Sequence, residues 1–182
     1  VLMYQLVHQD VDATGASVMI EMYSDRVEVS NPGRPPISVE RFIDEYRSRN
    51  ERLADFMRRL GICEEKGSGV DKVVKAAEIY QLPAPDFRVG ELRTTAILFA
   101  HQDFSSMTKA DRIRACYQHC CLMYVSNQRM SNQSLRDRFG LSESKAASVS
   151  QVIGAAKESG SIKADESETS STRYARYLPF WA

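Results

Sequence analysis

The sequence predicts an α+β protein in two modules: a mainly antiparallel sheet with helices on one face, then three helices that end in a hairpin. The first observation is periodicity, because segments with strand-like alternation and segments with helical spacing of apolar residues follow each other along the chain. The second observation is charge. Residues 1–105 carry 13 Lys and Arg against 17 Asp and Glu, whereas residues 106–182 carry 11 against 7. This change of sign predicts two domains, 1–105 and 106–182, and assigns any contact with nucleic acid to the basic one.

Three segments at the N-terminal end predict a helix followed by a β-hairpin. Residues 1–9 have the pattern of a helix that lacks its cap, so we expect the sequence to be the C-terminal part of a longer protein. Residues 17–23 and 26–30 alternate apolar with polar or charged side chains, and the short connection between them suits a hairpin. The second strand must end within 31–36, because proline cannot continue a sheet ladder.

Two amphipathic helices and a glycine-containing loop follow the hairpin. Apolar residues recur at helical spacing in 39–47 and again in 50–60, so both segments are expected to cover the sheet. A third helix leaves the loop at 64–71, and residues 87–100 predict two further strands. The side chains expected to face the core are Phe42, Ile43, Tyr46, Leu53, Phe56, Met57, Leu60, Val70, Val73, Val74 and Ala77.

The glycine-containing loop is a candidate phosphate-binding element. Gly67 and Gly69 allow the backbone to turn sharply and to approach a ligand closely, and the helix that follows offers unpaired N–H groups to an anion. A single pair of glycines before a helix is more often ordinary turn chemistry. The interpretation therefore depends on the other motifs in this part of the chain.

Five short motifs occur in order within residues 1–100. They are Val7-His8-Gln9-Asp10, Asp25-Arg26-Val27-Glu28-Val29-Ser30-Asn31-Pro32-Gly33, Arg49-Asn50, Arg58-Arg59-Leu60-Gly61 and Glu64-Glu65-Lys66-Gly67-Ser68-Gly69. This series resembles the GHKL-type ATPase domain of helicase-related transcriptional regulators. In that family a Schlafen/Alba-like DNA-binding domain usually precedes the ATPase-like domain.

The resemblance implies a GHKL-like α/β sandwich that binds ATP or ADP between the first helix and two loops. Asn31 takes the place of the aspartate that accepts a hydrogen bond from the adenine amino group, and an amide oxygen can still accept that bond. Gly33 belongs to the same motif. Gly67, Ser68 and Gly69 match the second glycine motif, which closes over the phosphates.

Two departures from the family pattern bear on catalysis. Tyr4 stands where the relatives carry the asparagine that holds Mg²⁺, and the acidic residue that orients the attacking water would precede Val1. Without them the phosphate charge is not offset by a metal and the water is not positioned. We therefore expect no ATP hydrolysis and doubt a bound Mg²⁺, while nucleotide binding and a purely structural platform both remain open.

The His8 and Asp10 pair could suggest acid–base chemistry. No nucleophile stands near them at a readable spacing. We prefer the interpretation that Asp10 caps a turn and that His8 makes a local hydrogen bond.

A cluster of three cysteines in the second module could suggest a metal site. Cys116, Cys120 and Cys121 surround His119, but a closed zinc site needs four ligands, usually from two segments. Cys116 and Cys120 also fit a buried apolar stripe of one helix, which we prefer because free cysteine packs as a small apolar residue.

The pattern of the second module is that of a winged helix-turn-helix domain. Three helices, a glycine-containing turn between the second and third, and a terminal hairpin are its components. Residues 134–142 are similar to the helix-turn of bacterial winged-helix regulators, and the C-terminal end resembles that of the helicase-related regulators. The helices are expected in 109–125, from the Ser131 cap to Gly140 and from the Ser142 cap to Ser159, and the strands in 162–165 and 173–178.

In such a domain the third helix enters the DNA major groove, and basic residues around it contact phosphates. Asp165, Glu166 and Glu168 at the expected wing tip would repel the DNA backbone, so we expect the base of the hairpin to bind instead. The residues assigned to DNA are Arg136, Arg138, Ser144, Lys145, Ser148, Gln151, Lys163, Arg173 and Arg176.

Together these patterns favour a DNA-binding transcriptional regulator whose GHKL-like domain senses a nucleotide or serves as a scaffold. An ATP-dependent, helicase-related enzyme and a dimerising interaction protein remain alternatives, so a homodimer is left open. No apolar run approaches the ~20 residues of a membrane span, and the N-terminal end has no signal-like pattern. We therefore expect double-stranded DNA as a partner, no membrane contact and a cytoplasmic location.

Overall fold

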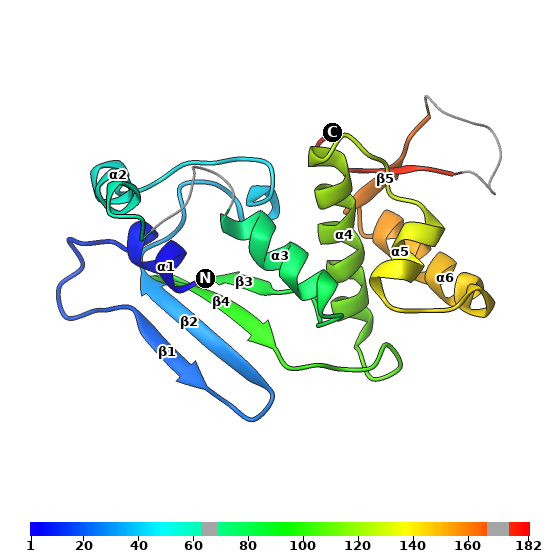
Figure 1. The fold of residues 1–182 in the computed structure, drawn as a ribbon, viewed down its shortest axis with the longest axis horizontal. Coiled ribbons are helices and arrows are strands. Elements are labelled where there is room, and N and C mark those ends of the chain that lie inside the picture. Colours follow the sequence, from blue (N-terminus) through cyan, green and yellow to red (C-terminus); the bar gives the residue numbers. More distant parts are fainter. Residues whose placement is uncertain (63–68, 167–174) are drawn as a thin grey trace. The chain divides into compact units, whose positions relative to one another are not determined.

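The computed structural model describes residues 1–62, 69–166 and 175–182 (Figure 1). Among the sequence-derived site residues, Gly67, Ser68 and Arg173 lie outside these ranges, as do Cys63 and Glu168.

The chain forms two compact units, and each is built from two separate stretches of the sequence. The first unit consists of Val1–Val73 and Pro85–Ala100, and the second of Val74–Ala84 and His101–Ala182. Helix α3 (Gly69–Ile79) contributes residues to both.

The first unit contains a four-stranded antiparallel sheet, as the sequence predicts. The strand order is β1-β2-β4-β3, so the hairpin of the two N-terminal strands places β1 at an edge. Val29 lies opposite Ala96, and Asn31 lies opposite Thr94. All four are buried, and because opposed residues point to the same face they mark the covered face of the sheet. The strands are β1 (Met19–Met22), β2 (Arg26–Pro32), β3 (Asp86–Val89) and β4 (Arg93–Phe99).

Helix α1 (Leu2–His8) lies on this covered face, beside β2 (Figure 1). The amide of Gln5, fully buried, donates to the Val29 carbonyl at 3.0 Å. The amide of Asn31 donates to the His8 carbonyl at 3.3 Å. Polar side chains therefore connect the helix to the strand that leads into the Asn31 loop, in addition to the apolar contact of Val7.

The segment expected to be a helix at 39–47 is instead a short 3₁₀ turn, η1 (Val39–Arg41), followed by turns. Phe42 and Ile43 are buried as expected, whereas Tyr46 is 41% exposed. A segment this short gains few helical hydrogen bonds for the cost of starting a helix. Burial of its two adjacent apolar side chains is enough to fix it without that helix.

Helix α2 (Glu51–Arg59) forms where the sequence predicts it, but its apolar face is not buried. Phe56 is 60% exposed and Leu60 56% exposed, and the buried position is Ala54. The prediction that these apolar residues face a core is therefore wrong. Periodicity reports which face of a helix is apolar and contains no information on whether another element covers it.

The second unit packs three helices and a two-stranded hairpin around one core. Capping boxes begin two of the helices, Thr108 with Asp111 and Ser131 with Ser134, so the Ser131 cap is confirmed. Ser142 precedes η2 and not the third long helix, which begins at Ala146. The elements are α4 (Lys109–Val125), α5 (Asn132–Arg138), η2 (Glu143–Lys145), α6 (Ala146–Glu158), β5 (Ile162–Ala164) and β6 (Tyr177–Pro179).

The segment Val74–Ala84 completes this second core. Ala84 is buried in the apolar core that α4, α5 and α6 form. Its carbonyl accepts a hydrogen bond from Arg114 at 3.1 Å. The Leu82 carbonyl accepts from Arg138 at 2.7 Å. Trp181 at the other end of the unit packs edge-on against Tyr124 and donates to the Tyr117 hydroxyl at 3.0 Å.

Candidate functional site

Asn31, the first residue of the expected nucleotide site, is buried at the end of β2. Its amide nitrogen donates to the carbonyls of His8 and Pro32, at 3.3 and 2.9 Å. Its Oδ1 has no hydrogen-bond partner within the described ranges. A buried acceptor without a donor costs about 1–3 kcal/mol, so Asn31 is held ready to accept one hydrogen bond.

Gly33 has a steric role that requires glycine. Its φ is +94°, and a Cβ at this position would lie 2.8 Å from the Asp10 Cβ and 3.3 Å from the Arg49 Cζ. Asp10 and Arg49 form an ion pair, and Arg49 also donates to the Arg34 carbonyl. Asp10 Oδ1 accepts from the Asp12 amide at 3.1 Å, which confirms the expected turn cap. Gly33 therefore allows the loop to approach this ion pair.

The Tyr4 ring fills the space between α1 and the start of α3. It stacks on His8 with 4.1 Å between ring centroids, and its Cδ2 lies 4.0 Å from where a Cβ on Gly69 would stand. Phe42 packs on it at 5.8 Å. Burial raises the pKa of the Tyr4 phenol. A buried aromatic ring at this place offers a metal-bound phosphate no carboxylate or amide oxygen.

Several buried polar atoms near these residues are unpaired. Gln5 Oε1, His8 Nδ1 and Asp71 Oδ1, like Asn31 Oδ1, find no partner in the described parts of the chain. Burial, with a smaller contribution from Arg49, lowers the pKa of His8 to about 4, so the imidazole is neutral at pH 7. Of the two ring nitrogens that could make the local hydrogen bond expected of His8, Nδ1 makes none within the described residues. Burial raises the pKa of Asp71 to about 6.

These atoms do not form a metal site. Across residues 1–62, 69–166 and 175–182, no group of three or more His, Cys, Asp or Glu side chains could hold an ion. The residues present fit the hydrogen-bonding part of a nucleotide better than its metal-bound phosphates.

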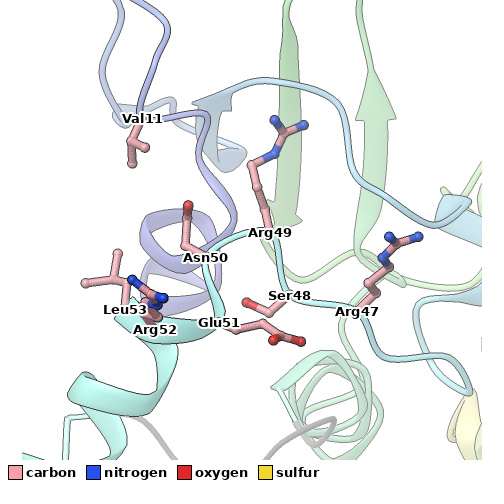
Figure 2. A pocket seen from close by; sticks show the side chains of 8 residues that line it. All are labelled: Val11, Arg47, Ser48, Arg49, Asn50, Glu51, Arg52 and Leu53. Carbon is pink, nitrogen blue, oxygen red and sulfur yellow. The ribbon is translucent and has the colours of Figure 1, made fainter.

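A pocket of about 660 Å³ that the sequence did not suggest lies beside the start of α2 (Figure 2). Three arginines line it, and the Asn50 amide beside them donates to the Val7 and Gln9 carbonyls at 2.8 Å each. The guanidinium groups point to different sides of the pocket and do not converge (Figure 2). The sequence signal that could have indicated this pocket is the run of arginines around the start of α2, at positions 47, 49 and 52. The lining residues are Val11, Arg47, Ser48, Arg49, Asn50, Glu51, Arg52 and Leu53.

The residues assigned to DNA are distributed over several elements of the second unit. Ser148 and Gln151 lie on α6, half-buried and exposed, whereas Ser144 and Lys145 belong to η2 and are exposed. Arg136, on α5, donates from Nε to Asn132 Oδ1 at 3.1 Å. At the hairpin, Lys163 is exposed and donates to the Ala182 carbonyl, and Arg176 is half-buried.

Arg138 differs from its expected role as a phosphate contact. The residue is only 5% exposed, and its guanidinium donates to the Leu82 carbonyl. The local sequence of α5 could not indicate that Arg138 is buried. The segment that accepts its hydrogen bond stands more than fifty positions earlier in the sequence.

Asp165 is not part of an exposed acidic tip. It is 9% exposed, and its carboxylate accepts from Arg129 Nε at 2.9 Å. Its charge is therefore paired with Arg129, and the expectation that Asp165 stands at an exposed wing tip is wrong.

The cysteines of α4 are core residues, as preferred from the sequence. Cys116 and Cys120 are fully buried in the apolar core of the unit, and Cys116 Sγ lies 3.9 Å from Met130 Sδ. Burial raises the pKa of Cys116 to about 12 and also raises the pKa of Cys120. These thiols are packed and uncharged.

His119, beside those cysteines, forms a polar chain that resembles a catalytic triad. Its Nδ1 lies 3.1 Å from the Glu78 carboxylate, and its Nε2 lies 3.1 Å from Ser134 Oγ. Ser134 Oγ also accepts from the Ser131 amide and donates to the Ser131 carbonyl, as part of the cap of α5. Because the hydroxyl is engaged in that cap, the chain is structural: it connects α3, α4 and α5.

The comparison with known protein families gives a match within the part of the sequence that holds the sheet of the first unit. Residues 15–98 match the family described as "Putative ATP-dependent DNA helicase recG C-terminal". No curated protein sequence matches the chain. None of the helices within the described ranges is both long enough and apolar enough to cross a membrane.

A solved structure shares the fold. The crystal structure of the DIP2311 protein from Corynebacterium diphtheriae matches with a TM-score of 0.52 and 16% sequence identity, over 97% of this chain and 38% of that chain. The present chain thus spans well under half of that relative. Residues 15–98 are similar to an ATPase-like domain related to the C-terminal region of recG helicase.

Proposed function

We propose that the second unit is a winged helix-turn-helix domain that binds double-stranded DNA, and that the chain is part of a transcriptional regulator. The observation that carries the proposal is the order and pairing of its elements. Helix α4 leads to Met130, which forms an antiparallel bridge with Tyr177, the first residue of β6. Helices α5 and α6 follow Met130, and the β5–β6 hairpin ends the unit. A strand residue between the first two helices that pairs with the last strand is typical of a winged helix.

The position of α6 supports this proposal. Val149, Val152, Ile153 and Ala156 bury one side of the helix in the core. The exposed side carries small or polar residues, so it can approach base edges without steric conflict. Lys145 stands directly before the helix and is exposed, and it supplies positive charge near the start of α6.

A salt-dependent gel shift tests DNA binding. Duplex DNA should bind at low salt and weaken by at least about tenfold between about 50 and 200 mM salt. Lys145→Glu should weaken binding further. Lys109→Glu makes the same charge change at the exposed first residue of α4 and should have a smaller effect. No shift at low salt would reject DNA binding and would leave the interaction module, which a measurement of oligomeric state would then examine.

We also propose that the first unit binds ATP or ADP without hydrolysing it. The unpaired Oδ1 of Asn31 supports this, because the adenine amino group is a donor of the right kind. Titration of a fluorescent ATP analogue should show binding that Gly69→Ala weakens. Gly154→Ala is the matched control, because Gly154 lies within α6 and a Cβ there meets nothing within 4 Å. Absence of binding by the unaltered chain would assign the first unit a scaffolding role.

A further inference from the structure

The second unit contains a cavity of about 380 Å³, and of its lining residues only Lys145 also belongs to the proposed DNA-binding surface. Its walls come from Gln81, from the stretch 101–107 before α4, and from the end of α5 with the turn that follows it. Every lining residue belongs to the second unit. A cavity of this volume is within the range that accommodates small organic molecules.

Arg138 gives this cavity its chemical character. Arg138 is only 5% exposed. Of its guanidinium nitrogens, Nη2 has an acceptor, the Leu82 carbonyl at 2.7 Å. Nε and Nη1 have no partner among residues 1–62, 69–166 and 175–182. The guanidinium stays charged, because arginine does not lose its proton in proteins. Both donor atoms are themselves buried, so an oxyanion in the cavity would pair with this cation once the guanidinium turns toward it.

The charged groups around the cavity favour an anion. Lys145 lines it and is exposed, as is His101. Asp103 is the carboxylate in the lining, and it is exposed. Burial lowers the pKa of Arg138, and the Glu78 carboxylate, which also lies near His119 Nδ1, opposes that lowering. Within the cavity lining, Asp103 is the carboxylate that could compete with a bound anion.

Two residues in the wall of this cavity have a positive φ. Gln81 has a φ of +52° and Gly140 a φ of +62°. A Cβ on Gly140 would stand 2.5 Å from Gln81 Nε2, so the Gln81 amide lies where a side chain at position 140 would otherwise stand. A positive φ is uncommon for a non-glycine residue such as Gln81.

We propose that the Arg138 cavity binds a small organic carboxylate, with the carboxylate at the Arg138 guanidinium and the carbon skeleton against Phe104, Met107 and Leu141. The apolar part of the lining distinguishes this from a site for inorganic phosphate, which offers no carbon surface to bury. The site lies at the α5–η2 turn, immediately before α6. It is independent of the nucleotide site in the first unit.

The probe that tests this is benzoate, with benzamide as its neutral counterpart and inorganic phosphate as the purely ionic one. Benzoate should raise the thermal midpoint of the 182-residue chain and bind measurably by calorimetry. Benzamide and phosphate should bind at least about tenfold more weakly, because each lacks one of the two features that the cavity recognises. Equal effects of benzoate and benzamide would overturn the proposal, and so would the absence of benzoate binding.

Substitutions locate the site. Arg138→Met should weaken benzoate binding by at least about tenfold. Arg136→Met makes the same change two positions earlier on α5, outside the cavity lining, and should leave affinity within about twofold. Asp103→Asn should tighten binding, because it removes the competing carboxylate. If Arg138→Met does not fold, Lys145→Met at the exposed rim should still reduce affinity, and unchanged affinity in Lys145→Met and Asp103→Asn would refute the site.

Discussion

Asp10 and Arg49, which stand 39 positions apart in sequence, form an ion pair with 3.1 Å between Oδ2 and Nη1. The pair joins the end of α1 to the segment before α2, and both side chains lie against Gly33. A loop that the family resemblance assigned to a ligand is therefore also a packing junction. Several consequences of this junction and of the buried groups near it can be measured.

Gly33→Ala should lower the free energy of unfolding by about 1–3 kcal/mol, because the new Cβ would meet Asp10 at 2.8 Å and the φ of +94° is strained for alanine. Gly15→Ala is the matched control. Gly15 also has a positive φ, +73°, but a Cβ there meets nothing within 4 Å, so only the strain is added. Urea denaturation of both variants compares them. Equal losses would show that the contact with Asp10 contributes nothing.

His8 should make the first unit sensitive to acid. Its folded-state pKa of about 4 lies below its usual 6.5, so the folded state binds the proton more weakly, and the stability it contributes is lost as pH falls from 6.5 towards 4. The loss should reach about 2 kcal/mol near pH 5. His8→Phe keeps the stacking on Tyr4 and should lack this loss. Unfolding free energies at pH 7 and pH 5 decide the matter, and the same pH dependence in both proteins would contradict it.

Asp71 should act in the opposite direction. Its folded-state pKa of about 6 lies above the usual 3.8, so the folded state binds the proton more tightly, and stability falls as pH rises between these values. Asp71→Asn should therefore be more stable than the unaltered chain at pH 8 and lose that advantage near pH 4. Thermal midpoints at the two pH values test this. A variant that is less stable at pH 8 would show that the charged carboxylate is needed.

Tyr4 should prevent ATP turnover and limit nucleotide affinity. We expect no Mg²⁺-dependent phosphate release, because the family resemblance expects an Mg²⁺-holding asparagine at the position of Tyr4. Tyr4→Asn removes the ring from beside Gly69 and should tighten binding of a fluorescent ATP analogue. Tyr4→Phe is the control, since it keeps the ring and should change little. Turnover by the unaltered chain would refute this prediction.

The buried cysteines should be inert in the folded protein. In a Cys63→Ser background, the remaining thiols are Cys116, Cys120 and Cys121, all buried, and burial raises the pKa of Cys116 to about 12. Because the thiolate is the reactive form, labelling by an aromatic disulfide should be at least about 100-fold slower than in urea. Rapid native labelling of any of the three would show that α4 is open to solvent.

Local signals predicted much of this fold. The N-terminal hairpin, the Ser131 cap and the cysteine stripe of α4 all follow from neighbours in sequence. Such features depend on alternation, on a side chain three residues from a backbone amide, or on one helix face. Each can be read within a window of a few residues.

The failures concern contacts between distant segments. Arg138 is covered by Leu82, and Asp165 is paired with Arg129, 36 positions earlier. The prediction for Phe56 failed for a related reason. Its neighbours in sequence show that it lies on an apolar helix face, but they do not show whether another element covers that face. Around the expected nucleotide site, the sequence pointed to Asn31 and Tyr4 but not to the ion pair at Gly33. Buried charge and exposed apolar surface are properties of the assembled unit, and local patterns do not contain them.

The grouping of Val74–Ala84 with the helical unit limits how this chain can be inherited or recombined. A gene fusion that joined residues from 101 onward to a different partner would leave behind the carbonyl that receives Arg138, the carboxylate that orients His119, and the buried methyl of Ala84. Shuffling of this domain between proteins therefore has to carry the end of α3 along with it. The second unit is therefore made of two separate stretches of sequence, and strands β3 and β4 of the first unit lie between them in the chain.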